Sequence, residues 1–369
     1  MRPTYLEVNL PQLRNNIEAI RAHVTPARVM LMVKANAYGH GVDGVAPFIE
    51  PYVDYFGVAL PEEGIRLREL GITKSILVAG GTLPEQVRFF ADYDLTLTGS
   101  SIELLDAAED TARSTGKRIK THLKIDTGME RVGVREYEAE MLIEKSKACS
   151  HIDIEGIYTH LANSELRDRA YSILQLERFH EVLSIYEKRS ISVPPLRHVC
   201  NSGGILNLPE AHFDMVRPGI LFYGVYPGDE VDRVVDVKPA LTWRSRVAYS
   251  KIARPGRSVS YGSLWQAEAE TRIVTIPCGY ADGYFRRMTN RAQIILNGRK
   301  YPQVGRICMD QFMVNVGDDE AQVGDGVVLL GESDSERITA ENFAAWMGTN
   351  EYEVLTNISA RVPRVYIAE

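Results

Sequence analysis

Residues Val29 to Gly41 read VMLMVKANAYGHG. Five apolar residues come first, followed by Lys34 and then by a short glycine-bearing loop with Tyr38 and His40. Such an apolar run predicts a buried strand that ends by presenting an amine at the edge of a sheet. Burial beside other cations lowers the pKa of a lysine, and the free amine then attacks aldehydes. The stretch therefore predicts either a Schiff-base lysine or a lysine that only caps a strand and extends into water.

Seven further apolar stretches follow this strand, and segments with helical periodicity lie between them. Eight strands alternating with helices before about residue 220 predict an α/β fold, the (β/α)8 TIM barrel. A doubly wound sheet is the alternative, but no GxGxxG fingerprint follows the first strand. The further strands are expected at Tyr55–Ala59, Ser75–Ala79, Asp94–Thr98, Ile119–Asp126, Asp153–His160, Leu196–Cys200 and Phe213–Arg217.

The helical segments and the opening of the chain complete this pattern. The stretch Tyr5–Leu10 resembles a strand, and we expect this first strand, at about residues 1–10, to be able to pack with a second domain. Helices are expected at Pro11–His23, Pro61–Leu70, Ser101–Thr115, Glu136–Cys149 and Ala170–Glu187.

The pattern changes after Gly224. Residues 227–239, PGDEVDRVVDVKP, are charged and punctuated by prolines, and β-rich runs such as LTWRSRVAYSKI and GDGVVLLG follow. We therefore expect two domains, a barrel at 1–230 and a mainly β C-terminal domain at 231–369.

Two turn signals lie between the strands of the second domain. Pro255–Gly256 and Asn297–Gly298 are turn dipeptides that hairpins use. One helix, near Thr339–Met347, is expected to interrupt the β pattern before the final strand.

Composition limits the classes of function. The 369 residues are 45% hydrophobic and 25% charged, so a large core is available. The net charge of -7 and the lack of a long basic run argue against nucleic-acid binding and favour small-molecule chemistry. With neither a signal peptide's apolar segment nor eighteen consecutive apolar residues, we expect a cytoplasmic protein without a membrane partner. The four cysteines form no CxxC pair, so we expect reduced thiols and no metal site.

Polar side chains stand where the predicted strands end. Functional groups of a (β/α)8 barrel lie at these carboxyl ends, so we expect the side chains to converge on one rim. Each of them alone could be explained as an ordinary turn residue or as a histidine with a structural hydrogen bond, so the prediction of a functional site depends on the whole set. The set is Lys34, Lys124, Asp126, His160, Asn201, Ser202 and Arg217.

Glycine-containing loops follow the seventh and eighth strands, NSGG at Asn201–Gly204 and RPGI at Arg217–Ile220. Barrels often bind phosphate in these two loops, because glycine lets backbone N–H groups approach an anion closely. A phosphate site near a Schiff-base lysine suggests pyridoxal phosphate as cofactor. The alternative is that both loops are only tight turns.

Several motifs in order along the chain resemble the alanine racemase family. They are VKANAYGHG, KIDTGMERVG, IYTHLANS, NSGG, MVRPGILFYG, VSYG, IPCGYADGYFRR, VGRICMDQFMVNVG, and the closing YEV with RVPRVY. The resemblance implies a pyridoxal phosphate barrel followed by a β domain, working as a head-to-tail homodimer with shared active sites. It implies a two-base racemase that interconverts L-alanine and D-alanine and supplies D-alanine for peptidoglycan.

The resemblance also assigns the catalytic side chains. Lys34 resembles the lysine that binds the cofactor covalently and serves as one acid/base group. Tyr261 matches the second such group, which the partner subunit contributes in the family. Racemisation removes a proton from one face of Cα and delivers another to the opposite face, which requires two such groups. His160 matches a histidine that assists this tyrosine, and Arg217 matches an arginine that binds this histidine and the pyridine nitrogen.

The binding residues are carried over in the same way. Arg131 and the backbone N–H of Met309 match groups that bind the substrate carboxylate, and Lys124 matches a lysine that is carbamylated in several members. The ligands expected for the cofactor phosphate are Tyr38, Ser202, Gly219, Ile220 and Tyr352. The residues expected at the substrate entrance are Tyr280, Tyr352, Arg286, Arg306 and Asp310.

Two positions bear on how this chain differs from relatives. Glu130 stands where many members carry glycine or asparagine, and it places a carboxylate beside Arg131 in the sequence. Tyr352 occupies a position that serine-preferring members can replace, so it favours a substrate with a small methyl side chain.

Other functions remain as alternatives. One is an amino-acid racemase of broader specificity that includes serine. Another is a related pyridoxal phosphate decarboxylase, although such enzymes carry a CxS-type motif where this chain has Cys308–Asp310. A non-catalytic pyridoxal phosphate carrier resembles only the first half of the chain. A Schiff-base aldolase without cofactor is suggested by Lys34 alone.

Overall fold

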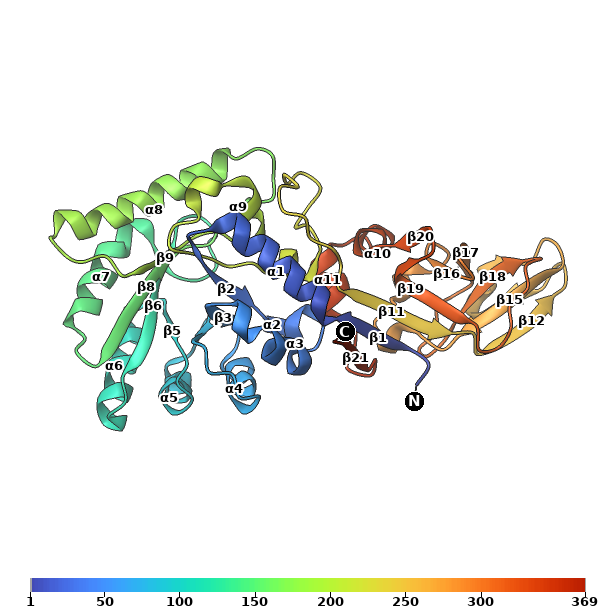
Figure 1. Ribbon diagram of the computed structural model, residues 1–369, viewed down its shortest axis with the longest axis horizontal. Helices are drawn as coiled ribbons and strands as arrows, with labels where there is room; N and C mark the ends of the chain where they lie inside the picture. The colour runs from blue at the N-terminus through green and yellow to red at the C-terminus, as the bar shows by residue number, and fades with distance from the viewer. Residues whose placement is uncertain (1, 369) are drawn as a thin grey trace. The chain divides into compact units, whose positions relative to one another are not determined.

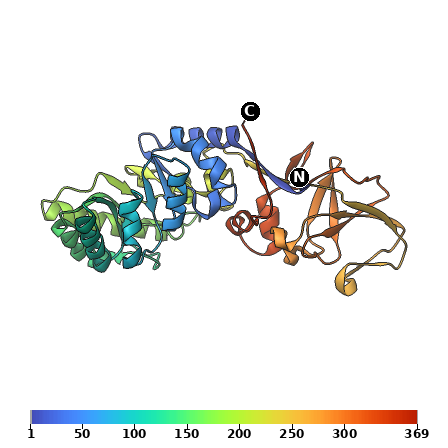
Figure 2. The same ribbon diagram turned by 90° about the horizontal axis from the view of Figure 1, so that it is seen from below.

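The computed structural model describes residues 2–368, and the chain divides into two compact units. Unit 1 comprises residues up to Gln12, Tyr38–Gly41 and the residues from Pro239 on. Unit 2 comprises Leu13–Ala37 and Val42–Lys238. Each unit has its own secondary structure (Figures 1 and 2).

Unit 2 contains eight strands that alternate with helices. Most of their residues are buried, as in parallel strands that are covered on both faces, and polar residues such as His122, Lys124 and His198 are buried among them. The strands are β2 (Arg28–Met32), β3 (Tyr55–Val58), β4 (Ile76–Val78), β5 (Leu97–Gly99), β6 (Ile119–Asp126), β8 (Ile152–Tyr158), β9 (Leu196–His198) and β10 (Met215–Val216), with β7 (Val134–Arg135) beside β6.

Backbone hydrogen bonds close the eight strands into a ring. Parallel pairing gives the orders β10-β2-β3-β4 and β5-β6-β8-β9. The N–H of Val78 donates to the carbonyl of Thr96 over 3.1 Å and joins β4 to the segment entering β5. The N–H groups of Asp214 and Arg217 donate to the carbonyls of Arg197 and Cys200, which joins β10 to β9. The predicted α/β fold is confirmed, and these bonds support its arrangement as a (β/α)8 barrel.

The helices of unit 2 lie along the outside of its strands (Figure 1). Ser101 caps the N-terminus of α6 by accepting from the N–H of Leu104, and Gly116, at φ 68°, ends it. The α-helices are α1 (Leu10–Val24), α2 (Lys34–Tyr38), α3 (Val42–Ile49), α4 (Pro61–Glu69), α5 (Val87–Asp92), α6 (Ile102–Thr115), α7 (Ala139–Ala148), α8 (Ala170–Lys188) and α9 (Ser202–Asn207); α1 begins and α2 ends within unit 1.

Unit 1 is mainly β, as expected. Its large sheet has the order β12-β15-β18-β17-β16-β19-β11-β1-β21, with β20 beside β19. The strands are β1 (Tyr5–Asn9), β11 (Leu241–Arg246), β12 (Tyr249–Ala253), β15 (Thr271–Ile276), β16 (Gln293–Leu296), β17 (Arg299–Val304), β18 (Phe312–Gly317), β19 (Gly326–Ser333), β20 (Glu336–Ile338) and β21 (Arg364–Ile367); β13 (Ser258–Val259) and β14 (Trp265–Gln266) pair separately.

An aromatic group centres the core of unit 1. The rings of Tyr284 and Phe312 stack with centroids 4.3 Å apart, and Phe343 and Trp243 meet Tyr284 edge-on. The opening strand β1 is antiparallel to β11 and parallel to β21, so the two ends of the described chain lie in one sheet. Figure 2 shows this sheet from a second side.

The turns and helices of unit 1 agree with the sequence only in part. Asn297–Gly298 joins β16 to β17 as a hairpin, with φ values of 49° and 74°. The hairpin expected at Pro255–Gly256 is wrong, because β12 pairs with β15 while β13 pairs with β14. The expected helix is present as α10 (Ala340–Met347), but a second helix, α11 (Glu351–Thr356), follows it. This helix is too short to show a helical period, and Asn350 caps it by accepting from the N–H of Glu353.

Two further structural facts concern the cysteines and the character of the helices. All four cysteines carry free thiols. From residue 2 to residue 368, no helix has both the length and the apolar character needed to cross a bilayer.

Candidate active site

Lys34 lies two residues after the end of β2, at the carboxyl end of the barrel strands, and is half-buried. Burial, and then the positive charge of Arg131, lower the pKa of Lys34. Two contacts hold the turn that carries this lysine. The N–H of Ala35 donates to Glu63 over 2.6 Å, and the side chain of Asn36 accepts from the N–H of Val42 over 2.8 Å. Lys34 therefore extends from a held turn and has an increased share of the free amine.

The turn after Lys34 is left-handed. Ala35, Asn36, Ala37 and Tyr38 have φ values of 53°, 57°, 54° and 49°. Left-handed backbone costs L-residues about 1–2 kcal/mol each, and consecutive residues rarely adopt it. Strain of this kind persists only where the surrounding structure enforces it, and it is concentrated at functional sites.

Arg217 follows β10 and is almost completely buried, with 4% of its surface exposed. One terminal nitrogen donates to Nδ1 of His198 over 2.8 Å, and the other donates to the carbonyls of Thr159 and Val199 and lies 3.4 Å from Nδ1 of His160. Burial lowers the pKa of Arg217 to about 10. All these partners are neutral acceptors, so a buried positive charge is available to a ligand.

Lys124 is a second buried cation near Arg217. Its Nζ donates to the carbonyl of Ile125 over 2.9 Å. Both Lys124 and Arg217 lie 5.2 Å from the centre of the Tyr158 ring. Burial, and then the charge of Arg217, lower the pKa of Lys124 to about 7. Near neutral pH much of this side chain is therefore a free amine.

His160 lies two residues after the end of β8. Burial and the charge of Arg217 lower its pKa well below the ordinary value, so the ring is neutral at physiological pH. Gln175 donates to the carbonyl of His160 over 3.0 Å and holds this position. A neutral imidazole in this place can accept a proton or a hydrogen bond.

The loops that follow β9 and β10 meet through Ser202. Its hydroxyl accepts from the N–H groups of Gly219 and Leu221, at 2.9 Å and 3.3 Å. Gly203 packs closely against the segment after β8, because a Cβ there would lie 2.6 Å from the hydroxyl of Ser164. The two loops predicted to bind phosphate are thus in contact.

Asp126 anchors the loop that carries Arg131. Its carboxylate accepts from the N–H groups of Gly128, Met129 and Arg131 over 2.8–3.0 Å. Glu130, whose φ is 54°, directs its carboxylate to Arg135 over 2.9 Å. The carboxylate next to Arg131 in the sequence is thus bound to a different arginine.

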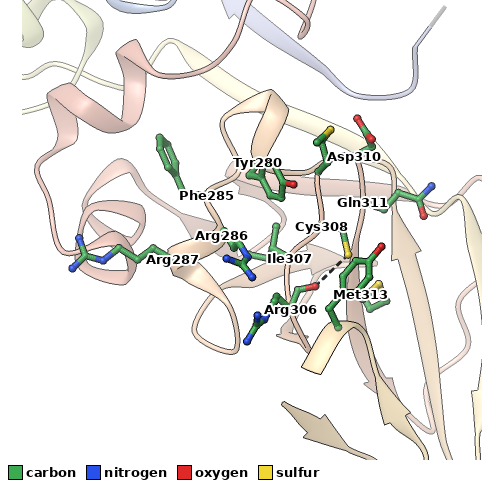
Figure 3. A pocket seen from close by; sticks show the side chains of 12 residues that line it. Tyr280, Phe285, Arg286, Arg287, Arg306, Ile307, Cys308, Asp310, Gln311 and Met313 are labelled. Carbon is green, nitrogen blue, oxygen red and sulfur yellow. Dashed lines mark hydrogen bonds between the residues drawn. The ribbon is translucent and has the colours of Figure 1, made fainter. Parts of the chain in front are cut away.

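A hollow of about 840 Å³ lies in unit 1 (Figure 3). Figure 3 shows Arg287 directed away from the guanidinium groups of Arg286 and Arg306. The hollow is rich in aromatic, arginine and sulfur side chains, and it is lined by Tyr261, Tyr280, Phe285, Arg286, Arg287, Arg306, Ile307, Cys308, Met309, Asp310, Gln311 and Met313.

A close approach of two loops builds this hollow. A Cβ on Gly279 would lie 2.3 Å from the carbonyl oxygen of Met309, so only glycine fits there. The N–H of Tyr280 donates to the carbonyl of Cys308 over 3.1 Å. The buried carboxylate of Asp282 accepts from the N–H of Gly279 over 3.0 Å and from Arg2 over 2.6 Å.

Tyr261 projects from this rim and is 72% exposed. The residue before it, Ser260, has φ 65° and ψ −176°, a combination that is almost restricted to glycine. The hydroxyl of Ser260 donates to the carbonyl of Arg306 over 2.6 Å and helps to hold this conformation. Backbone strain therefore lies directly next to a predicted catalytic residue.

Tyr38 and Tyr352 meet inside unit 1, with ring centroids 6.2 Å apart. Gly39 packs against α11, where a Cβ would lie only 2.0 Å from the carbonyl oxygen of Leu355. Arg364 donates to the carbonyl of Gly39 over 3.0 Å. These contacts hold the two tyrosines that are predicted to bind phosphate.

Family models match both halves of the chain. The alanine racemase N-terminal domain matches residues 8–227, and the alanine racemase C-terminal domain matches residues 240–366. The chain belongs to the alanine racemase family. A curated alanine racemase of Carboxydothermus hydrogenoformans is 45% identical to it, with 100% of both chains covered.

Solved alanine racemases have the same fold as this family member. The enzyme of Clostridium difficile 630 is 36% identical, with a TM-score of 0.94 that covers 100% of this chain and 96% of the other. The enzyme of Bacillus anthracis, solved with bound L-Ala-P, is 33% identical, with the same TM-score and the same coverage.

The alanine racemase signature thus falls into two groups of residues, one in each unit. Unit 2 brings together Lys34, Lys124, Arg131, His160 and Arg217, since the charges of the other four all lower the pKa of His160. Unit 1 gathers Tyr261, Tyr280, Arg286, Arg306, Met309 and Asp310 around its hollow. Asp310 also binds Arg361 over 2.7 Å.

Sequence reasoning missed several residues of these groups. His198 and Tyr158 contact Arg217, but both lie within strands. A polar residue inside a strand usually only makes a structural hydrogen bond, so neither position indicated a functional site. The inward position of the histidine in LRHVC was the available signal. Ser260, Phe285, Gln311 and Met313 lie within the motifs VSYG, IPCGYADGYFRR and VGRICMDQFMVNVG, which were the available signal, but only the folded loops bring them together.

Proposed function

We propose that this chain is a racemase that interconverts L-alanine and D-alanine with pyridoxal phosphate. One observation carries the proposal. Lys34 is a half-buried amine with a lowered pKa at the end of a barrel strand, in the same unit as the buried Arg217, whose partners are all neutral. A free amine and an available buried cation suit an anionic aldehyde as ligand.

The residues present fit pyridoxal phosphate. Lys34 offers the amine, Arg217 offers a buried donor, and the contact of Ser202 with Gly219 brings together the two loops in which barrels bind phosphate. When bound, the cofactor supplies an aldehyde that joins to amines and a ring that withdraws electrons from Cα of the attached amino acid. The residues that would hold it are Lys34, Tyr38, Ser202, Arg217, Gly219, Ile220 and Tyr352.

Lys34 and Tyr261 would serve as the two acid/base groups. The amine of Lys34 would take the proton from one face of Cα, and the phenol oxygen of Tyr261 would exchange a proton at the opposite face. A tyrosine, with an ordinary pKa near 10, is a weak base at neutral pH and needs an acceptor for its own proton. The neutral ring of His160, held beside Arg217, suits that role.

Arg217 would donate a hydrogen bond to the pyridine nitrogen. A guanidinium with a pKa of about 10 keeps its proton at neutral pH, so the nitrogen would stay unprotonated. The ring would then withdraw electrons less strongly, which favours racemisation over transamination. Arg217 would thus limit side reactions.

Substrate selection would involve both groups of residues. Arg131 and the N–H of Met309 would bind the substrate carboxylate, and Tyr352 would leave room for a methyl group. Tyr280, Tyr352, Arg286, Arg306 and Asp310 would form the entrance. The relative solved with bound L-Ala-P, and a Clostridium difficile relative solved in complex with cycloserine, support a small amino-acid-like substrate.

The active form would be a homodimer with shared active sites. Tyr261 is 72% exposed on the isolated chain, which suits a side chain that completes the site of a second copy. Residues 1–230 would carry the cofactor, while residues 231–369 would contribute Tyr261 and the entrance. We expect the dimer to act in the cytoplasm and to supply D-alanine for peptidoglycan.

Loss of optical activity from L-alanine tests this function. Purified chain with added pyridoxal phosphate should racemise L-alanine rapidly and L-serine slowly. Comparable rates with both would indicate a broader amino-acid racemase. Release of CO2 without racemisation would indicate a decarboxylase and would contradict the proposal.

A further inference from the structure

A row of buried polar side chains runs from Arg217 into the barrel. Arg217 donates to Nδ1 of His198 over 2.8 Å. Nε2 of His198 lies 2.9 Å from Nδ1 of His122, and Nε2 of His122 lies 3.8 Å from a carboxylate oxygen of Glu155. Both histidines are completely buried. No part of the proposed chemistry uses His122 or Glu155.

Arg217 sets the direction of hydrogen bonding at one end of this row, and the ionised carboxylate of Glu155, which cannot donate, favours the same direction from the other end. A guanidinium can only donate, so Nδ1 of His198 must accept, and a neutral ring then carries its hydrogen on Nε2. That hydrogen requires Nδ1 of His122 as acceptor, so the hydrogen of His122 also lies on Nε2. It faces Glu155, and Nε2 of His122 has no closer partner among residues 2–368.

Strand β8 contains a β-bulge where it meets this row. Its register with β6 shifts between Thr121 and His122: Ile154 lies opposite Thr121, Gly156 lies opposite His122, and Glu155 is the extra residue. A bulge of this kind re-aims the side chain of the inserted residue. A Cβ on Gly156 would lie 2.7 Å from the ring of His122, so glycine makes room for the imidazole.

The charges around Glu155 favour its ionised form. Its carboxylate accepts from Tyr55 over 3.2 Å, and Lys120 and His122 face it from β6. Burial raises the pKa of Glu155, but the nearby N–H of His122, the charge of Lys120 and the hydrogen bond from Tyr55 outweigh it, so this pKa is lowered. Burial lowers the pKa of both histidines, which keeps the rings neutral.

We propose that Glu155 is a positioning residue for Arg217, and that it acts through the fixed tautomers of His122 and His198. Its carboxylate lies 3.8 Å from Nε2 of His122, beyond hydrogen-bond distance, and places a negative charge at the end of the row. With both imidazoles fixed as Nε2–H tautomers, Nδ1 of His198 always accepts, so the guanidinium keeps one orientation. The catalytic consequence rests on the proposed function of Arg217, whereas the tautomers do not.

Nitrogen NMR tests the tautomers directly. The chain has eight histidines, so protein labelled with 15N only at histidine gives few signals, and His122→Phe assigns one of them. We expect both buried rings to be neutral Nε2–H tautomers from about pH 6 to about pH 9, with or without pyridoxal phosphate. An Nδ1–H tautomer or a cationic ring at either position in the unmodified chain would overturn the proposal.

Glu155→Gln removes the charge at nearly constant volume. We expect the signal of His122 to show exchange between tautomers, and kcat for alanine to fall roughly 10-fold with little change in KM. Glu155→Asp should restore the tautomer at least in part, which a purely structural role would not predict. Unchanged tautomers in folded Glu155→Gln would overturn the inference, even if the enzyme racemises alanine normally.

Asp153→Asn is the matched control. Asp153 lies two residues earlier on β8 and pairs with Arg118 near the surface, so its substitution should leave both imidazole signals unchanged. If Glu155→Gln does not fold, Gly156→Ala provides a second test, because the added methyl group should displace the ring of His122 and produce the same change. A folded Gly156→Ala with the original tautomers would count against the proposal.

Discussion

The two groups of predicted site residues differ in how far the chain itself completes them. In unit 2, Lys34, Lys124, His160 and Arg217 are buried or half-buried, and burial, followed by positive charges of the same unit, lowers the pKa of each. In unit 1, Tyr261 is 72% exposed on the rim of an open hollow. Burial in the barrel sets the protonation states of the first group. The loops of the second group form a hollow, but this hollow stays open on the isolated chain.

This contrast assigns different roles to the two regions. Burial without a carboxylate partner raises the free energy of each extra positive charge, so the barrel favours free amines and neutral imidazoles. The strained backbone at Ser260 and at Ala35–Tyr38 holds side chains in place in both regions, at a cost that the surrounding contacts must offset. The predictions below test whether the barrel residues act within one chain and whether the exposed residues need a second copy.

Removal of Lys34 should have the largest effect. Lys34→Ala should reduce racemisation by at least about 10⁴-fold, because both the covalent anchor and one acid/base group are lost. Borohydride treatment of the unmodified enzyme should attach pyridoxal phosphate permanently to the peptide that contains Lys34. Lys145→Ala, which affects a surface lysine paired with Asp106, should be fully active. Label on another lysine would refute the assignment.

Tyr261→Phe should have the next largest effect and tests the exposed group. Removal of the phenol oxygen should lower racemisation by about 10³-fold while the cofactor remains bound. Tyr249→Phe, at an exposed tyrosine of the same unit, is the control. Inactive Lys34→Ala mixed with inactive Tyr261→Phe should recover part of the activity by exchange of subunits. Normal turnover by Tyr261→Phe would contradict the two-base scheme. A mixture that recovers no activity would argue against shared active sites.

The pH dependence of carbamate formation at Lys124 tests whether the barrel lowers the pKa of its buried amines. With a pKa of about 7, its neutral fraction rises as the pH increases through 7, and the free amine can then add to CO2, forming an N–C bond and releasing a proton. A carbamate signal from 13C-bicarbonate should therefore increase from about pH 6 to about pH 8.5 and be absent in Lys124→Met. We expect Lys124→Met to be about 10-fold less active. An identical signal in Lys124→Met would place the carbamate elsewhere.

The same lowered pKa predicts the sign of a stability change. The folded chain binds fewer protons at Lys124 than the unfolded chain between pH 7 and the ordinary pKa of 10.5. Burial of this lysine thus destabilises the fold below pH 7, and this cost should decrease progressively as the pH rises through that window, so stability increases. Chemical unfolding of the parent and of Lys124→Met at two pH values within it measures the difference.

Glu130→Gly should have the smallest effect and concerns stability only. Glu130 has φ 54°, where glycine is strained least, so the substitution should raise the free energy of unfolding by about 0.5–1 kcal/mol. Glu138, with φ −107°, is the matched control, and Glu138→Gly should destabilise the fold. Urea denaturation distinguishes the two, and a loss of stability in Glu130→Gly would mean that the pair with Arg135 outweighs the strain.

Local patterns predicted much of the fold. All eight barrel strands and the longer helices were predictable, because burial on both faces produces continuous apolar runs and amphipathic helices produce a regular period. The Asn297–Gly298 hairpin was predictable because its turn chemistry is local. The short helix α11 and the pairing of β12 with β15 were not, because neither leaves a local period.

The sequence by itself determined which residues stand at the ends of barrel strands. A strand is recognised from a local pattern of residues, and the residue type at its end is then read directly from the sequence. Only the tertiary structure decided what these residues contact. The pairing of Glu130 with Arg135, the bulge that inserts Glu155, and the neutral surroundings of Arg217 depend on backbone geometry and on segments far apart in sequence. The pKa of a buried group depends on which charges surround it in space, and a linear order of residues does not contain that information.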